Sequence, residues 1–476
     1  MKTLEEHKES VERIASQMRV ISEDPKSKRI NFTHGSTNST RTEESEDFAC
    51  VDISDLNDVL EVNMQEGFVL VEPNVSLDKL LEITLEYNFI PQVVAEFPGI
   101  TVGGAINGAS LESSSFQYGQ FNDTAEKYEV VLSSGDVVTA SREENSDLFY
   151  GISGSYGTLG LLTLIKLRLA PAKKYVRLTY EPITSRQECL KLLRDRCNSP
   201  GVQYVEAILF DKTKGVVISG ELADDGDAPV CAYARAGDPW FYLHAKERVG
   251  QGKRYQELVP VSDYIFRYNR GAFWMGEQVL SVLRLPHNSL SRFLLNPWMN
   301  TRKCYDALRD TNMSQEYFIQ DFYVPFDKTS EFLEYTDKNL GIYPLWLCPL
   351  QPTQTPQKLS PHYSATHLMI DVGIYGQSAK YLADPIGVNE NFEDYAQALG
   401  ARKMLYAHAY YSPEKFWQMY DYDWYRELRT KYHADTAFPD IWEKVHVTRH
   451  KFERHLARGL FKLFVIETLQ WKDIGK

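Results

Sequence analysis

The sequence predicts an α+β fold with two domains. Its 476 residues are enough for two or three domains with cores of their own. Strand-like and helical stretches are mixed without strict alternation, and no G-x-G-x-x-G motif follows the first strand, which argues against a Rossmann unit. Three loops rich in small residues separate the first strands. These observations predict a mixed-sheet domain that holds a ligand at several points, followed by an α+β domain of different character.

The segment 98–108 is the strongest of these three loops. It carries four glycines within eleven residues, more than a simple turn needs. Repeated glycine suits a backbone that lies flat against a ligand, because the missing Cβ permits positive φ and close approach. The segments 34–40 and 151–160 are its companions upstream and downstream. Together they predict one long phosphate-bearing ligand.

The remaining elements follow from hydrophobic periodicity and from turn residues. The first part is expected to begin with a helix over 1–22 and to contain a second helix over 76–87 that starts at Ser76. Strands are predicted at 30–33, 49–53, 59–63, 68–72, 125–132, 137–140 and 161–169. Further on, strands are predicted at 175–180, 203–210, 215–219 and 403–411, helices at 185–196, 329–338 and 414–429, and loops at 223–229 and 349–361.

Composition excludes several classes of protein. The net charge of −13 argues against a general nucleic-acid binder, which needs an excess of lysine and arginine. The six cysteines form no C-x-x-C pair and have no histidine at metal-ligand spacing, so no metal site is predicted and reduced thiols in the cytoplasm are expected. The N-terminus has no apolar signal region, and no stretch reaches the length of a membrane span.

The C-terminal segment has an unusual pattern. Its apolar residues Phe452, Leu456 and Leu460 recur on one helical face beside basic residues such as Arg454 and Arg458. A basic amphipathic helix can lie on an anionic membrane surface, which would make the protein peripheral to a membrane. The same apolar face could instead pack on the body of the protein. The sequence also leaves open whether the chain forms a homodimer.

With these loops in place, the chain resembles the FAD-linked oxidoreductases of the vanillyl-alcohol-oxidase type, which share the p-cresol methylhydroxylase (PCMH) fold. Within them it is most similar to the Δ24-sterol reductase group. Short strings between about residues 30 and 445 carry this likeness, namely 111–115, 118–119, 144–150, 157–160, 171–176, 343–349, 370–376 and 404–407.

The resemblance implies a flavin domain over 1–175, a cap or substrate domain over 176–402, and a segment over 403–476 that returns to the flavin domain. FAD would be bound noncovalently, because relatives that attach it covalently carry a histidine inside the first loop, where this chain has Asn38. The implied cofactor-binding residues are Gly35, Ser36, Thr37, Asn38, Ser39, Gly99, Thr101, Gly103, Gly104, Asn107, Gly108, Ser114, Ser115, Gly119, Gly157, Thr158 and Gly160.

The implied activity is reduction, with NADPH, of a C=C bond in an apolar small molecule that resembles a sterol or terpenoid. One alternative is an oxidase or dehydrogenase that takes hydride from its substrate and passes the electrons to O2. A second is a flavin-bound protein without redox turnover, which binds or isomerises a lipid.

Reducing an alkene needs a hydride and a proton, so an acid should stand near the flavin. Glu112 follows the glycine segment directly, although it could instead bond backbone in a tight loop. Tyr406 and His408 alternate on a predicted strand and could also donate the proton, whereas a structural role is the other reading of His408. Arg267 and Arg270 could hold a substrate carboxylate or a phosphate, or stabilise reduced flavin, or form ion pairs. Phe273, Tyr343, Trp346 and Tyr375 are candidates for an apolar pocket lining.

Overall fold

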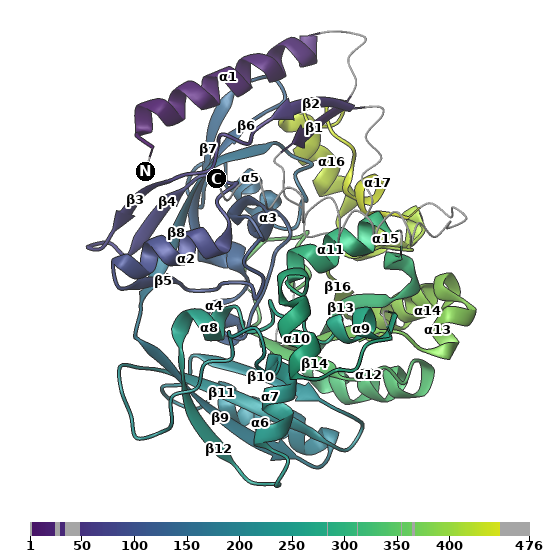
Figure 1. The fold of residues 1–476 in the computed structure, drawn as a ribbon. Helices are drawn as coiled ribbons and strands as arrows, with labels where there is room; N and C mark the ends of the chain where they lie inside the picture. Colours follow the sequence, from purple (N-terminus) through teal and green to yellow (C-terminus); the bar gives the residue numbers. More distant parts are fainter. Residues whose placement is uncertain are drawn as a thin grey trace.

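The computed structural model describes residues 2–23, 29–33, 48–282, 284–311, 313–353, 355–363 and 367–447. Two large sheets with accompanying helices dominate these residues (Figure 1). In Figure 1 the first sheet and the long helix α1 occupy the upper part, and much of the second sheet lies below them. This arrangement confirms the predicted α+β fold.

The first part of the chain builds a six-stranded antiparallel sheet around the long strand β8, which pairs with β4, β5 and β6. Its strands are β3 (Val59–Asn63), β4 (Phe68–Val71), β5 (Phe89–Pro91), β6 (Ala125–Val131), β7 (Val137–Ser141) and β8 (Leu161–Pro171). A parallel pair, β1 (Arg29–Thr33) and β2 (Phe48–Asp52), lies beside it. The helices of this part are α1 (Leu4–Glu23), α2 (Leu77–Glu86), α3 (Val102–Asn107), α4 (Ser115–Tyr118), the 3₁₀ turn Phe121–Thr124, and α5 (Ser146–Ile152).

Helix α1 forms as its apolar spacing predicts. Val11, Ile14 and Met18 recur at intervals of three and four and are buried against the core of the first domain. Its first turns are fastened by His7, whose ring nitrogens lie 2.7 Å from the Glu72 carboxylate and 3.1 Å from that of Glu129. The helix therefore covers the sheet through both an apolar face and a buried ionic contact.

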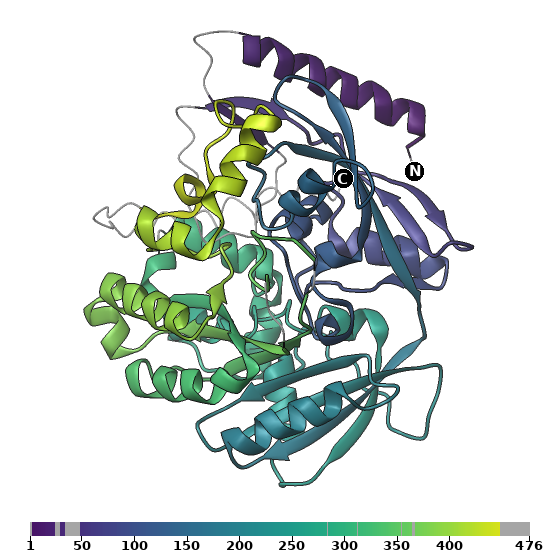
Figure 2. The same ribbon diagram turned by 180° about the vertical axis from the view of Figure 1, so that it is seen from behind.

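The middle of the chain builds an eight-stranded antiparallel sheet in the order β12-β9-β11-β10-β14-β15-β13-β16. The strands are β9 (Tyr175–Ile183), β10 (Tyr204–Leu209), β11 (Gly215–Ala223), β12 (Tyr255–Pro260), β13 (Phe318–Pro325), β14 (Leu345–Leu350), β15 (Met369–Gly376) and β16 (Arg402–Lys403). Figure 2 shows α6 (Arg186–Cys197) lying over one face of this sheet, and α12 (Phe326–Asn339) and α14 (Pro385–Ala398) extend the same layer.

The two faces of the second sheet have different chemistry because successive side chains point to opposite sides. On the helix-covered face, β13 and β15 present Phe322 and Val372, which pack in an apolar core. On the other face the same strands present Asp321 and Asp371, which look toward the first sheet. The two acids therefore lie on the face that meets the first sheet domain.

Short helices complete the molecule. Those of the cap are α7 (Phe241–Arg248), α8 (Val261–Ile265), α9 (Gly276–Val282), α10 (Ser289–Leu295), α11 (Thr301–Asp310), α13 (Ala379–Ala383) and the 3₁₀ turns Asn296–Trp298 and Ser314–Glu316. The last described helices are α15 (Pro413–Met419), α16 (Tyr422–Lys431) and α17 (Ile441–Val445). Among the described residues, no helix is both long and apolar enough to cross a membrane.

The C-terminal helices α16 and α17 return to the first sheet domain, beside β1 and β2 (Figures 1 and 2). The Ile30 N–H donates to the Ala437 carbonyl at 2.7 Å, and the Arg429 guanidinium donates to the Thr158 carbonyl at 2.9 Å. The two ends of the described chain are thus joined in one domain.

Two predicted elements are wrong in this region. The expected strand 403–411 ends after Lys403, because the buried Lys403 ammonium donates to the His408 carbonyl and to the Glu393 carboxylate, which folds the chain back. Tyr406 and His408 therefore do not share a strand face. The expected helix 414–429 is divided into α15 and α16, and Asp421 caps the second of them by accepting the Trp424 N–H at 3.0 Å.

Candidate active site

A cavity of about 360 Å³ lies between the two sheet domains. One wall comes from the glycine segment and from residues 156–162 of the first domain, and α17 contributes Lys444. The opposite wall comes from α11 and from strands β13, β14 and β15 of the cap. Of the three small-residue loops expected at the site, the glycine segment and the loop 151–160 are thus represented, and the first loop lies outside the described residues.

The glycine segment folds differently from the expected flat loop. From Val102 to Asn107 it forms helix α3, and the Thr101 hydroxyl caps it by accepting the Gly104 N–H at 3.2 Å. Gly103 is needed for packing, since a Cβ there would lie 2.7 Å from the Pro73 Cβ. The glycines therefore let a short helix pack closely on its neighbour at the cavity wall.

Asn107 joins this helix to the third small-residue loop. Its side-chain oxygen accepts the Gly157 N–H at 3.0 Å and the Ser155 hydroxyl at 3.2 Å. Gly157 has a φ of +74°, and a Cβ there would enter the cavity, with only the Lys444 ammonium within 4 Å. This open backbone and the nearby positive charge fit the phosphate-bearing part of a flavin nucleotide.

The predicted cofactor residues fall into three groups. Those that line the cavity are Thr101, Gly103, Gly104, Asn107, Gly108, Gly157 and Gly160. Those that the structure places outside its lining are Gly99, Ser114, Ser115, Gly119 and Thr158. The predicted first loop, with His34, Gly35, Ser36, Thr37, Asn38 and Ser39, lies outside the described residues, as does the basic segment 449–476.

The residues of the second group have contacts that explain their type. The Ser114 hydroxyl donates to the Gln92 carbonyl at 2.9 Å, and the Ser115 hydroxyl accepts the Glu112 N–H at 3.0 Å. Gly119 has a φ of +80° where a Cβ would collide with Asp123. The Thr158 hydroxyl donates to the Ser155 carbonyl at 2.8 Å. For these four residues local folding accounts for the small or polar side chain.

The cap wall of the cavity is rich in aromatic rings. Phe273, Trp346 and Tyr375 line it, as the sequence predicts, and the Phe273 ring lies 5.3 Å from the Trp346 ring and 5.1 Å from the Tyr375 ring. Tyr343 lies elsewhere, because its hydroxyl accepts a hydrogen bond from Arg186 at 2.8 Å outside the cavity lining. The rings form an apolar surface opposite the glycine wall.

Three buried carboxyl groups, those of Glu96, Asp321 and Asp371, belong to the cavity lining beside this aromatic surface. Asp321 accepts the Tyr375 hydroxyl at 2.5 Å and the Tyr406 hydroxyl at 2.6 Å, and burial raises its pKa to about 6 despite these bonds. Burial raises the pKa of Glu96 to about 8 and that of Asp371 well above its usual range. Sequence reasoning missed these acids, although an aspartate in an otherwise apolar strand was a usable signal in β15.

Glu112 and Arg267 form a buried ionic cluster outside the cavity lining. Arg267 donates to Glu112 at 2.5 Å and to Glu206 at 2.8 Å, and Glu206 also accepts the Trp346 indole N–H at 2.8 Å. Burial raises the pKa of Glu112, an effect that Arg267 opposes and Glu206 reinforces. This placement differs from the expected acid over the flavin ring. The cluster instead ties the 112–115 segment to β10 and supports Trp346 from behind.

Two further candidates also lie away from the cavity lining. The Arg270 guanidinium donates to the Tyr233 and Ala236 carbonyls, both at 2.7 Å, and so holds the cap loops together. His408 is buried beside Lys403, and its carbonyl accepts the Gln320 amide at 3.2 Å. Of the five predicted catalytic residues, Tyr406 alone lines the cavity.

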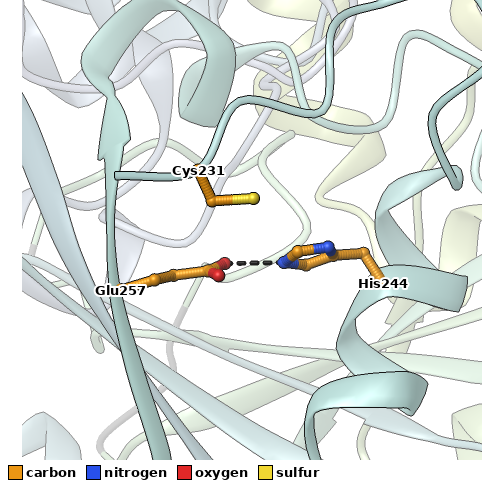
Figure 3. Close-up of side chains that lie close together, drawn as sticks. All are labelled: Cys231, His244 and Glu257. Atoms are coloured by element: carbon orange, nitrogen blue, oxygen red, sulfur yellow. Dashed lines mark hydrogen bonds and ion pairs between the residues drawn. The ribbon is translucent and has the colours of Figure 1, made fainter. Parts of the chain in front are cut away.

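The structure also gathers Cys231, His244 and Glu257, a combination that sequence spacing did not indicate (Figure 3). The His244 ring bonds the Glu257 carboxylate at 2.7 Å. The Arg248 guanidinium lies 3.4 Å from both, and the Tyr180 hydroxyl donates to Glu257 at 2.8 Å. Arg248 thus supplies the positive charge that a metal ion would bring to these ligands.

Comparison with known proteins agrees with this geometry. Residues 9–141 match the family model of an FAD binding domain. Over 399 residues the chain is 30% identical to human Δ24-sterol reductase, which covers 82% of this chain and 76% of the human protein. It is 31% identical over 422 residues to a Δ24-sterol reductase homolog of Caenorhabditis elegans, covering 82% and 77%. A shorter match, 34% over 133 residues and 27% of this chain, links it to 25% of cytokinin dehydrogenase 7 of Oryza sativa subsp. japonica.

The fold and the cavity therefore define an FAD-dependent oxidoreductase with a PCMH-type flavin domain. The long matches place it further: the chain belongs to the Δ24-sterol reductase family.

Proposed function

We propose that the protein reduces an isolated C=C bond in an apolar molecule of the sterol or terpenoid class, with NADPH as the electron source. The aromatic surface with its embedded carboxyl groups, opposite the glycine wall, is the observation that carries this proposal. FAD supplies two-electron hydride chemistry when it is bound. The names of the long relatives support the substrate class.

The residues of the cavity suit an uncharged substrate. Among the described residues that line the cavity, Lys444 is the only basic one. It lies at the glycine wall, where its ammonium donates to the Tyr156 carbonyl at 2.6 Å. No lining base is left for a substrate carboxylate at the aromatic surface. Phe97, Phe273 and Trp346 can instead bury hydrocarbon and keep water from the reacting carbons.

An oxidase or dehydrogenase is the second candidate function. The match of the flavin domain to a cytokinin dehydrogenase supports it, since that relative is named for the reverse direction of hydride transfer. In the cavity, Asp321 would be the base that accepts a substrate proton, because its pKa of about 6 keeps it ionised at neutral pH.

An anaerobic absorbance titration separates these functions. We expect NADPH to bleach the flavin band of the purified holoprotein, and a Δ24-sterol or a prenylated terpenoid to restore it. A flavin that ignores NADPH but is bleached by a reduced, alcohol-type substrate would favour the oxidase. A flavin that no donor bleaches, in a protein that still binds sterol, would indicate a non-redox role.

We further propose that FAD is bound noncovalently and that the protein is a cytoplasmic homodimer. Its segment 449–476 would make peripheral contact with a membrane. Denaturation followed by filtration tests the first of these: we expect the yellow flavin to separate from the chain. Deletion of 449–476 should reduce binding to anionic liposomes if the tail is interfacial, and unchanged binding would contradict that role.

A further inference from the structure

Asp371, in the middle of β15, is a buried acid to which none of the roles above applies. Its side chain is fully buried and lines the cavity, and within the described part of the chain neither carboxyl oxygen has a hydrogen-bond partner. An ionised carboxylate without a partner is costly to bury, whereas the neutral acid is much less so. This site therefore favours the protonated form.

The groups that face Asp371 come from every strand and loop packed against it, and none of them carries a positive charge. They are Asp321 and Tyr323 of β13, Cys348 of β14, Tyr375 of β15, Tyr406, and Glu96 of the flavin domain. Burial raises the pKa of the three tyrosines and of Cys348 well above their usual ranges, so these groups stay neutral. The negative charge of Asp321 further raises the pKa of Asp371.

Asp371 differs in this respect from the other acid of the cap wall. Asp321 accepts two phenolic hydrogen bonds, which stabilise its carboxylate, and the charge of Lys403 acts in the same direction. Asp371 has neither kind of support. At neutral pH Asp321 is therefore ionised and Asp371, on the adjacent strand, is protonated. Two similar carboxyl groups can then have different chemical roles because their surroundings differ.

We propose that Asp371 is the catalytic residue that delivers the proton to the substrate carbon, an assignment that rests on the proposed reductase function. The C=C π bond breaks and two C–H bonds form. One carbon receives a hydride, with the two electrons that NADPH supplied through the flavin, and the other receives the Asp371 proton. The cofactor is oxidised, the substrate is reduced, and the Asp371 carboxylate regains its proton from water before the next turnover.

Tyr406 is the predicted proton donor that does line the cavity, but it has a different role in this reaction. Its hydroxyl proton is already committed to Asp321, and its pKa is raised by burial and by that carboxylate. Tyr406 is therefore a positioning residue for Asp321, and its loss should alter the pH profile more than the proton-transfer step itself.

The test compares full-length holoproteins carrying Asp371→Asn, Glu96→Gln or Asp337→Asn. Asp337 pairs with Arg186 outside the cavity and is the matched control. Reduction of the flavin by NADPH and its reoxidation by a Δ24-sterol are followed separately. We expect Asp371→Asn to keep the first step and to slow the second by a factor of ~100 or more, the usual contribution of a general acid. Asp337→Asn should change neither step.

A second readout does not depend on turnover. In wild-type holoprotein labelled with carboxyl-¹³C aspartate, we expect an infrared carbonyl band of a protonated aspartic acid at pH 7 that moves on labelling. The label excludes Glu96, and Asp371→Asn should remove the band.

Either of two results would overturn the proposal. One is a kinetic result: the flavin of Asp371→Asn is reoxidised by sterol within threefold of the wild-type rate, whether or not Glu96→Gln slows this step. The other is the absence of the labelled band in the wild type, which decides the matter even if Asp371→Asn fails to hold flavin. Failure of the reductase function itself is distinguishable, because the wild-type protein would then leave the sterol unreduced.

Discussion

The contact of His7 with two carboxylates predicts that the flavin domain loses stability at alkaline pH. His7 lies on the buried face of α1, and its pKa is raised to about 9, since hydrogen bonds to Glu129 and Glu72 outweigh the opposing effect of burial. In the unfolded chain the same group titrates near 6.5. The folded state therefore holds one more proton between these two pH values.

The size of the effect follows from linkage. At about 1.4 kcal/mol for each pKa unit, the difference between 6.5 and about 9 is worth ~3 kcal/mol. This stability is fully present below pH 6.5 and is lost as the pH rises through about 9. Replacement of His7 by Gln removes the charge, so the variant should be less stable than wild type at pH 6 by about this amount and nearly equal to it at pH 10.

Hydrogen exchange of the α1 amides, corrected for intrinsic rates, measures the opening free energy at each pH. Lys8→Gln on the exposed side of α1 is the control, because Lys8 is exposed and pairs with the exposed Glu5 at 4.0 Å. A constant difference between wild type and His7→Gln from pH 6 to pH 10 would refute the reasoning, since it would mean that His7 acts by packing and not by charge.

Three further substitutions have definite expectations. Gly373→Ala places a Cβ against the Tyr375 hydroxyl and 2.8 Å from the Asp321 oxygen, so we expect loss of that hydrogen bond at about 1.5–3 kcal/mol and a higher pKa of Asp321 in the pH profile of turnover. Arg267→Gln leaves buried Glu112 without its cation, at a cost of about 3–5 kcal/mol, and should lower the melting temperature and the soluble yield. Arg429→Gln removes donors to carbonyl groups of the C-terminal segment and of the third small-residue loop, and should lower flavin content per chain while β-sheet circular dichroism is retained.

Much of the fold could be predicted because local pattern and tertiary burial agree. The apolar stripe of α1 and the alternation of β8 correspond directly to the faces that are buried. The prediction of a strand at 403–411 is wrong because a tertiary contact sets the end of the strand: Lys403 is held by Glu393 of helix α14. No local pattern contains that contact.

The site was predicted in outline but not in its chemistry. The small residues around Asn107 and Gly157 could be recognised in the sequence as part of the cavity wall. Close packing of two backbone segments requires small residues, whichever segments are packed together. Acids are different, since neither the polar stretch around Glu112 nor the apolar strand around Asp371 shows which charged groups will face them. Only the fold shows that Glu112 is neutralised by Arg267, whereas Asp371 faces the cavity without a partner.

The return of α16 to the flavin domain has a consequence for how the protein is synthesised. Gly151 of α5 lies so close to Leu428 of α16 that a Cβ there would overlap it, and Arg429 reaches the loop that ends at β8. The ribosome makes these partners nearly three hundred residues apart. The first sheet can form early, but the nascent chain must wait until the helix has emerged before the flavin domain is closed. Translation products that stop before α16 should therefore accumulate without flavin and depend on chaperones.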